Sequence, residues 1–487
     1  MKDAKAAGSA DDARVAGVPA GGVAPPRLSR SLPQVYAAAA LRLLLPLVVL
    51  PLMASRVGAD EFGRLSFILV WAGLLAMIVE GGFLAAATRL AVAADAPRRW
   101  QLAQQVFTAR CVLCVPAVLL AVVAVLWADP QAVAATGPLA HSPAQSMVET
   151  HAGIDTLAIA ALACALGWPA TWYLQATHQL NRWARVELAV YGALLLLCWP
   201  LARSVEAYLL LQLGASTALA VLGWRWLKRD LGAIGDLAEA ASGSKLPGSR
   251  SPGSRSTSSG STNSTAHASL WAPRQLRAGL KLGWTMMPVS IAGAAYSFAL
   301  PAAASSQLPK AELGLYFMAD RIVRAVLGAA DPVFSVVYPR IVGLFAQSSR
   351  AALVYSARWA LAGLIAGTTM FAAGALMWPW LVAVGTSRFG ALDPARLHDV
   401  LQILGWLLPL LLGWKFFGYW MLGSGRFDTA YRSCVSVCGI VGTALALTLG
   451  GAAGAVGLAW TALGVESVVI AVAVTGVLLT RRLRSRT

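Results

Sequence analysis

Residues 51–91 read PLMASRVGADEFGRLSFILVWAGLLAMIVEGGFLAAATRLA, and this stretch decides the fold class. A short polar segment ends at Glu61, and the apolar run from residue 63 to residue 87 contains only two charged residues, Arg64 and Glu80. About 20 consecutive apolar residues are enough for a helix to cross the ~30 Å hydrocarbon core of a bilayer. The stretch therefore predicts a transmembrane helix with two charges inside it.

The composition of the whole chain agrees with this prediction. Hydrophobic residues make up 58% of the 487 residues and the mean hydropathy is +0.65, whereas charged residues make up only 13%. A soluble domain has about 25% charged residues. These values exclude a soluble enzyme, a disordered scaffold and a disulfide-stapled secreted module. The apolar stretches are continuous, so an outer-membrane barrel, whose strands alternate polar and apolar residues, is excluded as well.

Apolar windows of similar length recur along the chain, and we predict twelve transmembrane spans in two sets of six. The first set lies near residues 34–53, 63–87, 105–127, 154–176, 184–202 and 205–224, and the second near 283–304, 312–338, 353–377, 398–422, 430–450 and 454–479. The predicted fold is an all-α polytopic membrane protein, with about 12 transmembrane helices in two pseudo-symmetric six-helix bundles around a central cavity.

The segments outside the spans divide the chain further. We predict a disordered cytoplasmic leader (1–30), an N-terminal six-helix bundle (31–226), a flexible cytoplasmic linker (227–272), a C-terminal six-helix bundle (273–480) and a basic cytoplasmic tail (481–487). The leader is rich in Ala, Gly and Pro and lacks the apolar core of a signal peptide. The linker contains GSRSPGSRSTSSGSTNST, a composition typical of a flexible connection.

The distribution of Lys and Arg predicts the orientation. If the N-terminus is inside, 28 of the 39 Lys and Arg residues lie in or beside cytoplasmic segments and 6 lie at the outer side. This asymmetry predicts that both termini are cytoplasmic. The net charge of +17 then favours anionic phospholipid, and no nucleic acid, as the partner. We expect no metal site and no cofactor, because the cysteines lack neighbouring His or carboxylate residues and no nucleotide-binding glycine loop occurs.

Four positions repeat between the two sets of spans with a constant shift of 251 residues. They are Glu61, Gly63, Glu80 and Arg89 in the first set, and Glu312, Gly314, Asp331 and Arg340 in the second. The repeat predicts a duplicated six-helix unit whose pseudo-axis runs along the membrane normal. These residues could instead have separate structural roles without a duplication. The glycines would then permit a tight outer loop, and the arginines would anchor the inner helix ends.

The eighth span, 312–338, carries four charged residues: Asp320, Arg321, Arg324 and Asp331. Each charge near the bilayer centre costs about 2.5 to 3.5 kcal/mol if it faces lipid, so these residues are expected to face water, one another or a ligand. The alternative is a closed pair between Asp320 and Arg324, which are one helical turn apart and would hold the bundle together.

Basic residues also occur inside other spans, at Arg42, Arg110 and Lys415. The candidate substrate-binding residues are Arg42, Arg110, Arg321, Arg324 and Lys415, because a cavity lined by cations selects an anion and guanidinium suits phosphate. For Arg110 and Lys415, the alternative is that the side chain reaches out to the membrane surface. The candidate ion-coupling residues are the intramembrane carboxylates Glu80, Asp320, Asp331 and Glu466, which could instead be fixed partners in ion pairs.

Four stretches resemble one family when they are taken together. They are residues 51–91, WYLQATHQLNRWA (172–184), ELGLYFMADRIVRAVLGAADPVFSVVYPRI (312–341) and GAVGLAWTALGVE (454–466). In order and spacing they resemble the Wzx-type flippases for O-antigen or exopolysaccharide repeat units, which belong to the multidrug/oligosaccharidyl-lipid/polysaccharide (MOP) exporter superfamily. The resemblance covers all twelve spans and leaves out the leader and the linker.

The resemblance implies a transporter and not an enzyme. It implies translocation of an undecaprenyl-pyrophosphate-linked oligosaccharide across the bacterial inner membrane by alternating access, for cell-surface polysaccharides such as lipopolysaccharide. Polysaccharide polymerases and glycosyltransferases of the same pathway are the implied protein partners. The Ser/Gly linker is longer than the family's usual connection, so we expect the two halves to be loosely tethered.

Two other functions fit parts of the sequence. The first is a MATE-like drug/cation antiporter, which the cationic span disfavours because its substrates are mostly cations. The second is a membrane-embedded polysaccharide polymerase or ligase, which needs catalytic residues on a large outer loop. The largest outer loop, 128–153, has no Lys or Arg, and its polar residues at and near the loop, His141, Glu149, His151 and Asp155, are interpreted as solvated.

Overall fold

A computed structural model describes residues 28–92, 94–128, 143–177, 179–243, 269–284, 300–330, 348–385, 393–423 and 454–484, with runs of one to three residues between 287 and 448. In these ranges the chain is helical and contains no strand. Eight described helices are long and apolar enough to cross a membrane: 59–80, 96–127, 152–176, 182–201, 205–232, 349–380, 394–418 and 454–476. The prediction of an all-α polytopic membrane protein is confirmed.

The helices of each half follow the order of the predicted spans. In the first half they are α1 (Leu28–Val57), α2 (Ala59–Glu80), α3 (Phe83–Val92), α4 (Ala96–Ala128), α6 (Pro143–Gly167), α7 (Thr171–Ala176), α8 (Leu180–Leu201) and α9 (Val205–Gly243). In the second half they are η3 (Pro273–Gln275), α10 (Leu276–Trp284), α12 (Leu300–Ala304), α13 (Lys310–Gly328), α15 (Ser349–Gly385), α16 (Pro394–Gly405), α17 (Leu407–Gly423) and α19 (Gly454–Arg484).

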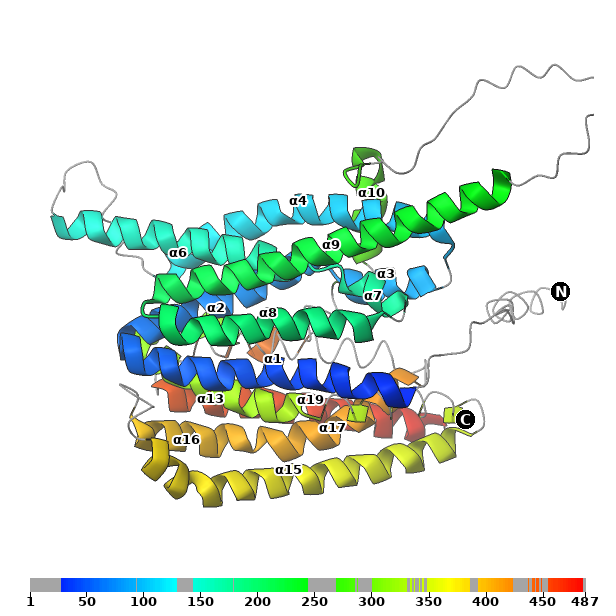
Figure 1. The fold of residues 1–487 in the computed structure, drawn as a ribbon. Helices are drawn as coiled ribbons and strands as arrows, with labels where there is room; N and C mark the ends of the chain where they lie inside the picture. Colours follow the sequence, from blue (N-terminus) through cyan, green and yellow to red (C-terminus); the bar gives the residue numbers. More distant parts are fainter. Residues whose placement is uncertain are drawn as a thin grey trace, which may run out of the picture.

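The long helices run in roughly the same direction or its reverse, and α1 and α13 pack together at the boundary between the halves (Figure 1). The end of the bundle at which α1 begins and α19 ends is called the terminal end, on the right in Figure 1. The opposite end, at which α2, α9, α13 and α19 begin, is called the distal end. The described chain therefore starts and stops at the same end of the bundle, as an even number of membrane crossings requires.

The helix boundaries support the duplication. The helices α2 and α13 begin 251 residues apart, at Ala59 and Lys310. The helices α6 and α16 also begin 251 residues apart, at Pro143 and Pro394. A constant shift across separate helices is what a duplicated unit produces, because equivalent loops then have similar lengths.

Two predicted spans of the first half are interrupted. The second span ends as α2 at Glu80, because Gly81 and Gly82 have φ of +61° and +75°, which a helix does not allow, and α3 then begins at Phe83. The fourth span breaks between α6 and α7, where Pro169 has no backbone N–H to continue the helix. Both breaks free backbone groups that need other partners inside the bundle.

The linker prediction is wrong for residues 227–243, because α9 continues as a helix to Gly243. Leu227 is fully buried, and Asp230 accepts hydrogen bonds from the hydroxyl of Tyr173 and from Gln179 Nε2, the latter at 2.9 Å. These contacts attach the extension of α9 to the first half. The Ser/Gly composition that predicted the linker begins beyond this extension, and residues 244–268 lie outside the described residues.

The far end of the linker is also attached to the first half, so the expectation of a loose tether is wrong for residues 269–284. Gln104 Nε2 of α4 donates to the Ser269 carbonyl at 2.8 Å, and Thr108 Oγ1 of α4 accepts from Ala272 N at 3.0 Å. The helix α10, which follows, packs against α4. The entry to the second half is therefore fixed to the first half.

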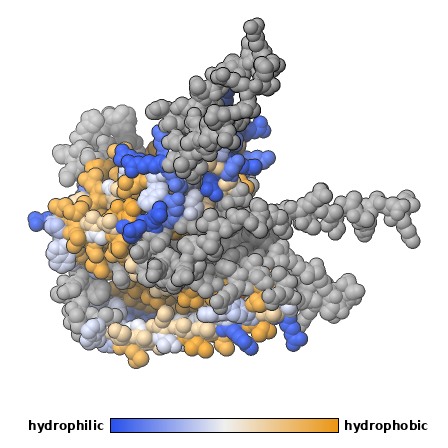
Figure 2. All heavy atoms as spheres, turned by 45° about the vertical axis from the view of Figure 1, so that its right-hand side comes forward, coloured by the Kyte–Doolittle hydropathy of each residue, from blue (hydrophilic) through white to orange (hydrophobic). Residues whose placement is uncertain are grey.

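Exposed apolar side chains cover the outside of the bundle. Leu196 on α8, Leu210 on α9 and Leu376 on α15 are 75%, 68% and 81% exposed. Figure 2 shows broad hydrophobic areas on the visible face, with hydrophilic residues in separate groups. Long apolar helices with leucines on the outer surface fit a lipid environment, in which those side chains have no reason to be buried.

We expect the linker and both chain ends to be cytoplasmic, because the Lys and Arg residues concentrate there. In a chain whose own cysteines are replaced, Ser254→Cys in the linker should resist a membrane-impermeant maleimide in intact cells. Gln307→Cys, at an exposed position of the distal end, should react. Permeabilised cells provide the control for reactivity. Labelling of Ser254→Cys from outside would overturn this orientation.

Candidate functional site

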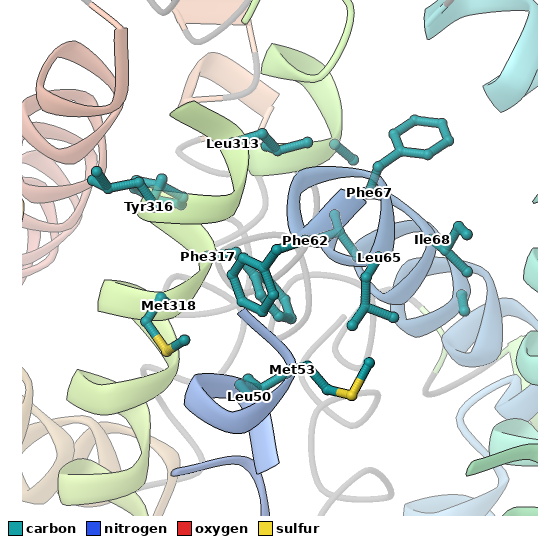
Figure 3. Close-up of a cluster of buried hydrophobic side chains, with 14 of the residues drawn as sticks. Leu50, Met53, Phe62, Leu65, Phe67, Ile68, Leu313, Tyr316, Phe317 and Met318 are labelled. Carbon is teal, nitrogen blue, oxygen red and sulfur yellow. The ribbon is translucent and has the colours of Figure 1, made fainter. Parts of the chain in front are cut away.

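The boundary between the halves is built from apolar residues of α1, α2 and α13. Figure 3 shows Phe62 of α2 beside Phe317 of α13, with Met53 of α1 nearby. Phe62 and Met53 have no exposed surface, and Phe317 is 3% exposed. This packing holds α13 against the first half and places the next turns of α13, which carry the charged residues, at the same boundary.

Asp320 and Arg324 form an ion pair on α13. Arg324 Nε donates to both carboxylate oxygens of Asp320, each at 2.8 Å. Asp320 is 4% exposed, whereas the Arg324 side chain is 28% exposed. The closed pair, one of the two alternatives from the sequence, is therefore present. It lowers the cost of two intramembrane charges, because each is partly neutralised by the other.

Arg321 points in another direction. Its guanidinium lies 4.7 Å from the ring centroid of Phe317, one turn earlier on α13. It also lies within electrostatic range of Tyr208, which belongs to α9 of the first half. Arg321 therefore brings a positive charge to the boundary between the halves.

Glu466 of α19 completes the charged group around α13. The residue is 9% exposed and lies within electrostatic range of Arg324. Arg324 therefore interacts with two carboxylates, Asp320 on its own helix and Glu466 on another. Four predicted site residues, Asp320, Arg321, Arg324 and Glu466, are brought together; they are called the α13 charge group. The group contains two arginines and two carboxylates, so its formal charge is zero if all four side chains are ionised.

Arg110 lies elsewhere, inside the first half. It is 1% exposed, and its Nη1 donates to the carbonyls of Trp168 and Pro169 at 2.7 and 2.9 Å. These carbonyls are freed by the break between α6 and α7. The alternative that Arg110 reaches out to the membrane surface is wrong, because the freed carbonyls inside the bundle attract the guanidinium.

Glu80 lies at the other helix break and caps α3. Its carboxylate accepts from Gly82 N at 2.9 Å and from Leu84 N at 2.5 Å. Glu80 and Arg110 line one cavity of about 210 Å³ within the first half, together with Glu187 and Ser216. The structure therefore gives Glu80 and Arg110 defined structural partners at two neighbouring breaks, away from the α13 charge group.

Of the remaining predicted site residues, Lys415 is the one whose side chain the structure describes. Lys415 is on α17 of the second half, and its Nζ lies 4.1 Å from the ring centroid of Phe334. The side chain of Arg42 and the whole of Asp331 lie outside the described residues. The five basic residues therefore do not share one described cavity, and their binding roles stay predictions.

An ionic cluster that was not predicted from the sequence lies at the distal end. Arg64 of α2 is 4% exposed, and its Nε and Nη2 donate to Asp155 of α6 at distances from 2.6 to 3.1 Å. Its Nη1 donates to Glu61 at 3.2 Å and to Glu206 of α9 at 2.9 Å. The interpretation of Asp155 as solvated is wrong, since it is 9% exposed. The i, i+3 spacing of Glu61 and Arg64 was the one local signal.

A cavity of about 470 Å³ lies beside this cluster and between the halves. Its lining includes Arg64, Asp155 and Phe67 from the first half, and Ser305 and Lys310 from the second. Both polar and aromatic side chains therefore face this space at the distal end.

Comparisons with known proteins agree with the arrangement of the helices. A family model described as polysaccharide biosynthesis protein matches residues 36–345. A search of curated protein sequences finds no match. One similar solved structure is an inward-facing multidrug resistance MATE family transporter of the MOP superfamily, with a TM-score of 0.62 and 13% identity over 91% of this chain and 95% of that chain. Another is the lipid II flippase MurJ in an inward closed conformation, with a TM-score of 0.59 and 10% identity over 92% and 87% of the two chains.

These identities are low, so the structural matches show a shared fold, whereas the family model covers more than half of the chain. The expected family is confirmed by the family model, and the expected fold is confirmed by the solved structures. The two solved structures named here are a transporter and a flippase, and this chain shares their fold. The chain therefore belongs to the polysaccharide biosynthesis protein family and has the fold of the MOP superfamily of transporters and flippases.

Proposed function

We propose that this protein translocates a lipid-linked oligosaccharide, carried on undecaprenyl pyrophosphate, across the bacterial inner membrane by alternating access. The observation that carries the proposal is the α13 charge group at the boundary between two packed halves, in a chain of the polysaccharide biosynthesis family. A polar headgroup that crosses a bilayer needs polar partners at membrane depth, since lipid tails offer none.

Arg321 and Arg324 are the proposed ligands of the pyrophosphate. Guanidinium groups bind phosphate oxygens through two parallel hydrogen bonds, which is stronger and more directional than the contact of a lysine ammonium. Arg321 lies over Phe317 near Tyr208, and Arg324 is 28% exposed beside its carboxylate partner. An arriving pyrophosphate would compete with Asp320 and Glu466 for these guanidinium groups.

We propose that proton binding is coupled to transport through the net charge of the α13 charge group. Proton binding at Glu466 removes one negative charge and leaves the group with a net positive charge, which favours an anionic headgroup. Proton release restores neutrality and favours release of the headgroup. Glu466 is suited to this role because it is buried and has no hydrogen-bonded cation of its own among the described residues, whereas Asp320 is held by Arg324.

Reconstitution in vesicles tests the function. The probe is a fluorescent undecaprenyl-pyrophosphate disaccharide, and a membrane-impermeant quencher reports how much of it reaches the other leaflet. We expect faster exchange than in vesicles without protein, and a loss of at least about tenfold for Arg321→Ala. The control Arg98→Ala, at an exposed position of the terminal end, should retain activity.

Two results would contradict the proposal. Exchange no faster than in empty vesicles would remove the flippase function. Transport of ethidium against a proton gradient, without movement of the lipid probe, would favour the drug/cation antiporter instead.

Imposed gradients test the coupling. A pH gradient across the vesicles is expected to change the exchange rate of the wild-type protein, because Glu466 then carries a proton on one side of the cycle. Glu466→Gln keeps the size of the side chain and removes the titration, so its exchange rate should not respond to the gradient. An equal response in both proteins would exclude Glu466 as the coupling residue.

A further inference from the structure

The two halves carry equivalent ionic clusters at the distal end. In the first half, Arg64 of α2 binds Asp155 of α6 and Glu206 of α9. In the second half, Glu312 of α13 forms an ion pair with Arg396 of α16 and accepts a hydrogen bond from Ala455 N of α19 at 3.0 Å. Each cluster, called a clamp here, ties three helices together.

The clamps join equivalent helices of the repeat. The helices α2, α6 and α9 of the first half correspond to α13, α16 and α19 of the second, with starts 251, 251 and 249 residues apart. The polarity is reversed, because a central arginine binds carboxylates in the first clamp and a central glutamate binds an arginine and a backbone N–H in the second. The central residues are not at equivalent positions, since Arg64 corresponds to Leu315, but both clamps join the same three helices of the repeat.

The two clamps meet at a close helix crossing. Gly63 follows Glu61 on α2, and Gly314 occupies the equivalent place after Glu312 on α13. A methyl group on Gly63 would lie 1.8 Å from the carbonyl oxygen of Lys310, and one on Gly314 would lie 3.2 Å from the Cα of Gly63. The backbones are in direct contact, so a side chain at either glycine would push the halves apart.

Other contacts continue this crossing into the bundle. Phe62 of α2 and Phe317 of α13 belong to one buried cluster and lie close together (Figure 3). More than two turns further along α2, Trp71 Nε1 donates to Ser305 Oγ of the second half at 3.3 Å. The contact between the halves at the distal end therefore includes backbone, aromatic and polar groups.

We propose that the Gly63–Gly314 crossing is the closed distal gate of the transporter, and that each clamp makes the distal end of its half move as one rigid body when this gate opens. The proposal rests on the proposed alternating-access function. In the structure the gate is closed. Opening it requires α2 and α13 to separate, and the clamps carry that motion to α6 and α9 on one side and to α16 and α19 on the other.

A labelling experiment tests the gate without any substrate. Ser305→Cys is placed in a chain whose own cysteines are replaced; Ser305 is 8% exposed and lies at the contact between the halves. Gly314→Val is then added, and a membrane-impermeant maleimide is applied from the distal side. We expect the labelling rate to rise by at least about tenfold, because the valine cannot fit in the closed crossing.

The matched control is Gly464→Val on α19, where a side chain meets nothing within 4 Å. This variant also replaces a helical glycine by valine, so it has the same effect on helix propensity, and it should leave the labelling rate unchanged. An unchanged rate in Gly314→Val, or an equal rise in both variants, would overturn the gate. The result does not depend on transport, so it separates failure of the gate from failure of the proposed function.

Cross-linking tests the clamps. Two cysteine pairs are treated with the same short bis-thiosulfonate reagent: Trp71→Cys with Ser305→Cys joins the halves, and Glu312→Cys with Arg396→Cys joins α13 to α16 within one half. The first link should abolish exchange of the lipid probe, and the second should leave it within about twofold of the unlinked variant. A reducing agent should reverse the first effect.

Loss of exchange with the link inside the half would show that the clamp opens during the cycle, and would overturn its role as a rigid connection. Undiminished exchange with the halves linked would overturn the gate. Because each linked protein is compared with its own unlinked form, effects of the cysteine substitutions on folding cancel.

Discussion

Arg324→Gln is expected to destabilise the protein by about 3 to 5 kcal/mol, the cost of removing one partner from a buried ion pair. The substitution leaves the carboxylates of Asp320 and Glu466, which are 4% and 9% exposed, without the cation they share. Two buried carboxylates then remain at membrane depth without Arg324. The unfolding temperature in detergent and the amount of inserted protein measure the effect.

The double variant Asp320→Asn/Arg324→Gln separates structure from function. It removes both charges; Asn has the size of Asp, and Gln is two heavy atoms smaller than Arg. Most of the stability should return, because the effects of substitutions at contacting residues are not additive. If Arg324 also binds the pyrophosphate, the double variant should be stable and lose at least about tenfold in exchange rate. A double variant that is stable and fully active would leave Arg324 without a role in binding.

Arg64→Gln is expected to have a stability effect of similar size, again about 3 to 5 kcal/mol. Arg64 is the common partner of Asp155, Glu61 and Glu206, and the buried Asp155 contributes most because water reaches the other two. Without the arginine, three carboxylates remain within one small region. The unfolding temperature in detergent should fall accordingly.

Arg56→Gln provides a matched control at the same end of the bundle. Arg56 also makes several hydrogen bonds, but its acceptors are the neutral carbonyls of Cys198, Trp199 and Ala202. Its loss should cost less, about 1 to 3 kcal/mol, because no charge is left without a partner. Equal losses for Arg56→Gln and Arg64→Gln would show that the ionic character of the cluster contributes nothing.

The sequence predicted the class and the repeat well because these depend on local patterns. The length of each apolar run is fixed by the thickness of the bilayer, and the shift of 251 between Glu61 and Glu312 is visible without any structure. The Asp320–Arg324 pair was also visible as an alternative, since residues four apart on a helix lie on one face.

The helix breaks were harder to predict. Gly81, Gly82 and Pro169 stand in the sequence, but such residues also occur inside unbroken transmembrane helices, as Pro116 does in α4. Whether the helix continues depends on partners for the freed backbone groups. Here Glu80 and Arg110 supply those partners, and their positions are known only after the bundle is packed.

The sequence by itself determined that the chain is an all-α membrane protein with a duplicated unit and with charges buried at membrane depth, since hydropathy and spacing follow from bilayer thickness and helix geometry. The tertiary structure decided which charges meet. Arg64 and Asp155 are 91 residues apart, and Glu312 and Arg396 are 84 apart, so no local pattern links them. The tertiary structure also shows the structural role of Gly63 and Gly314, which from the sequence could equally belong to tight loops. Only the packing of α2 on α13 shows that the two glycines let the halves touch, because close backbone contact is a property of two surfaces and not of one segment.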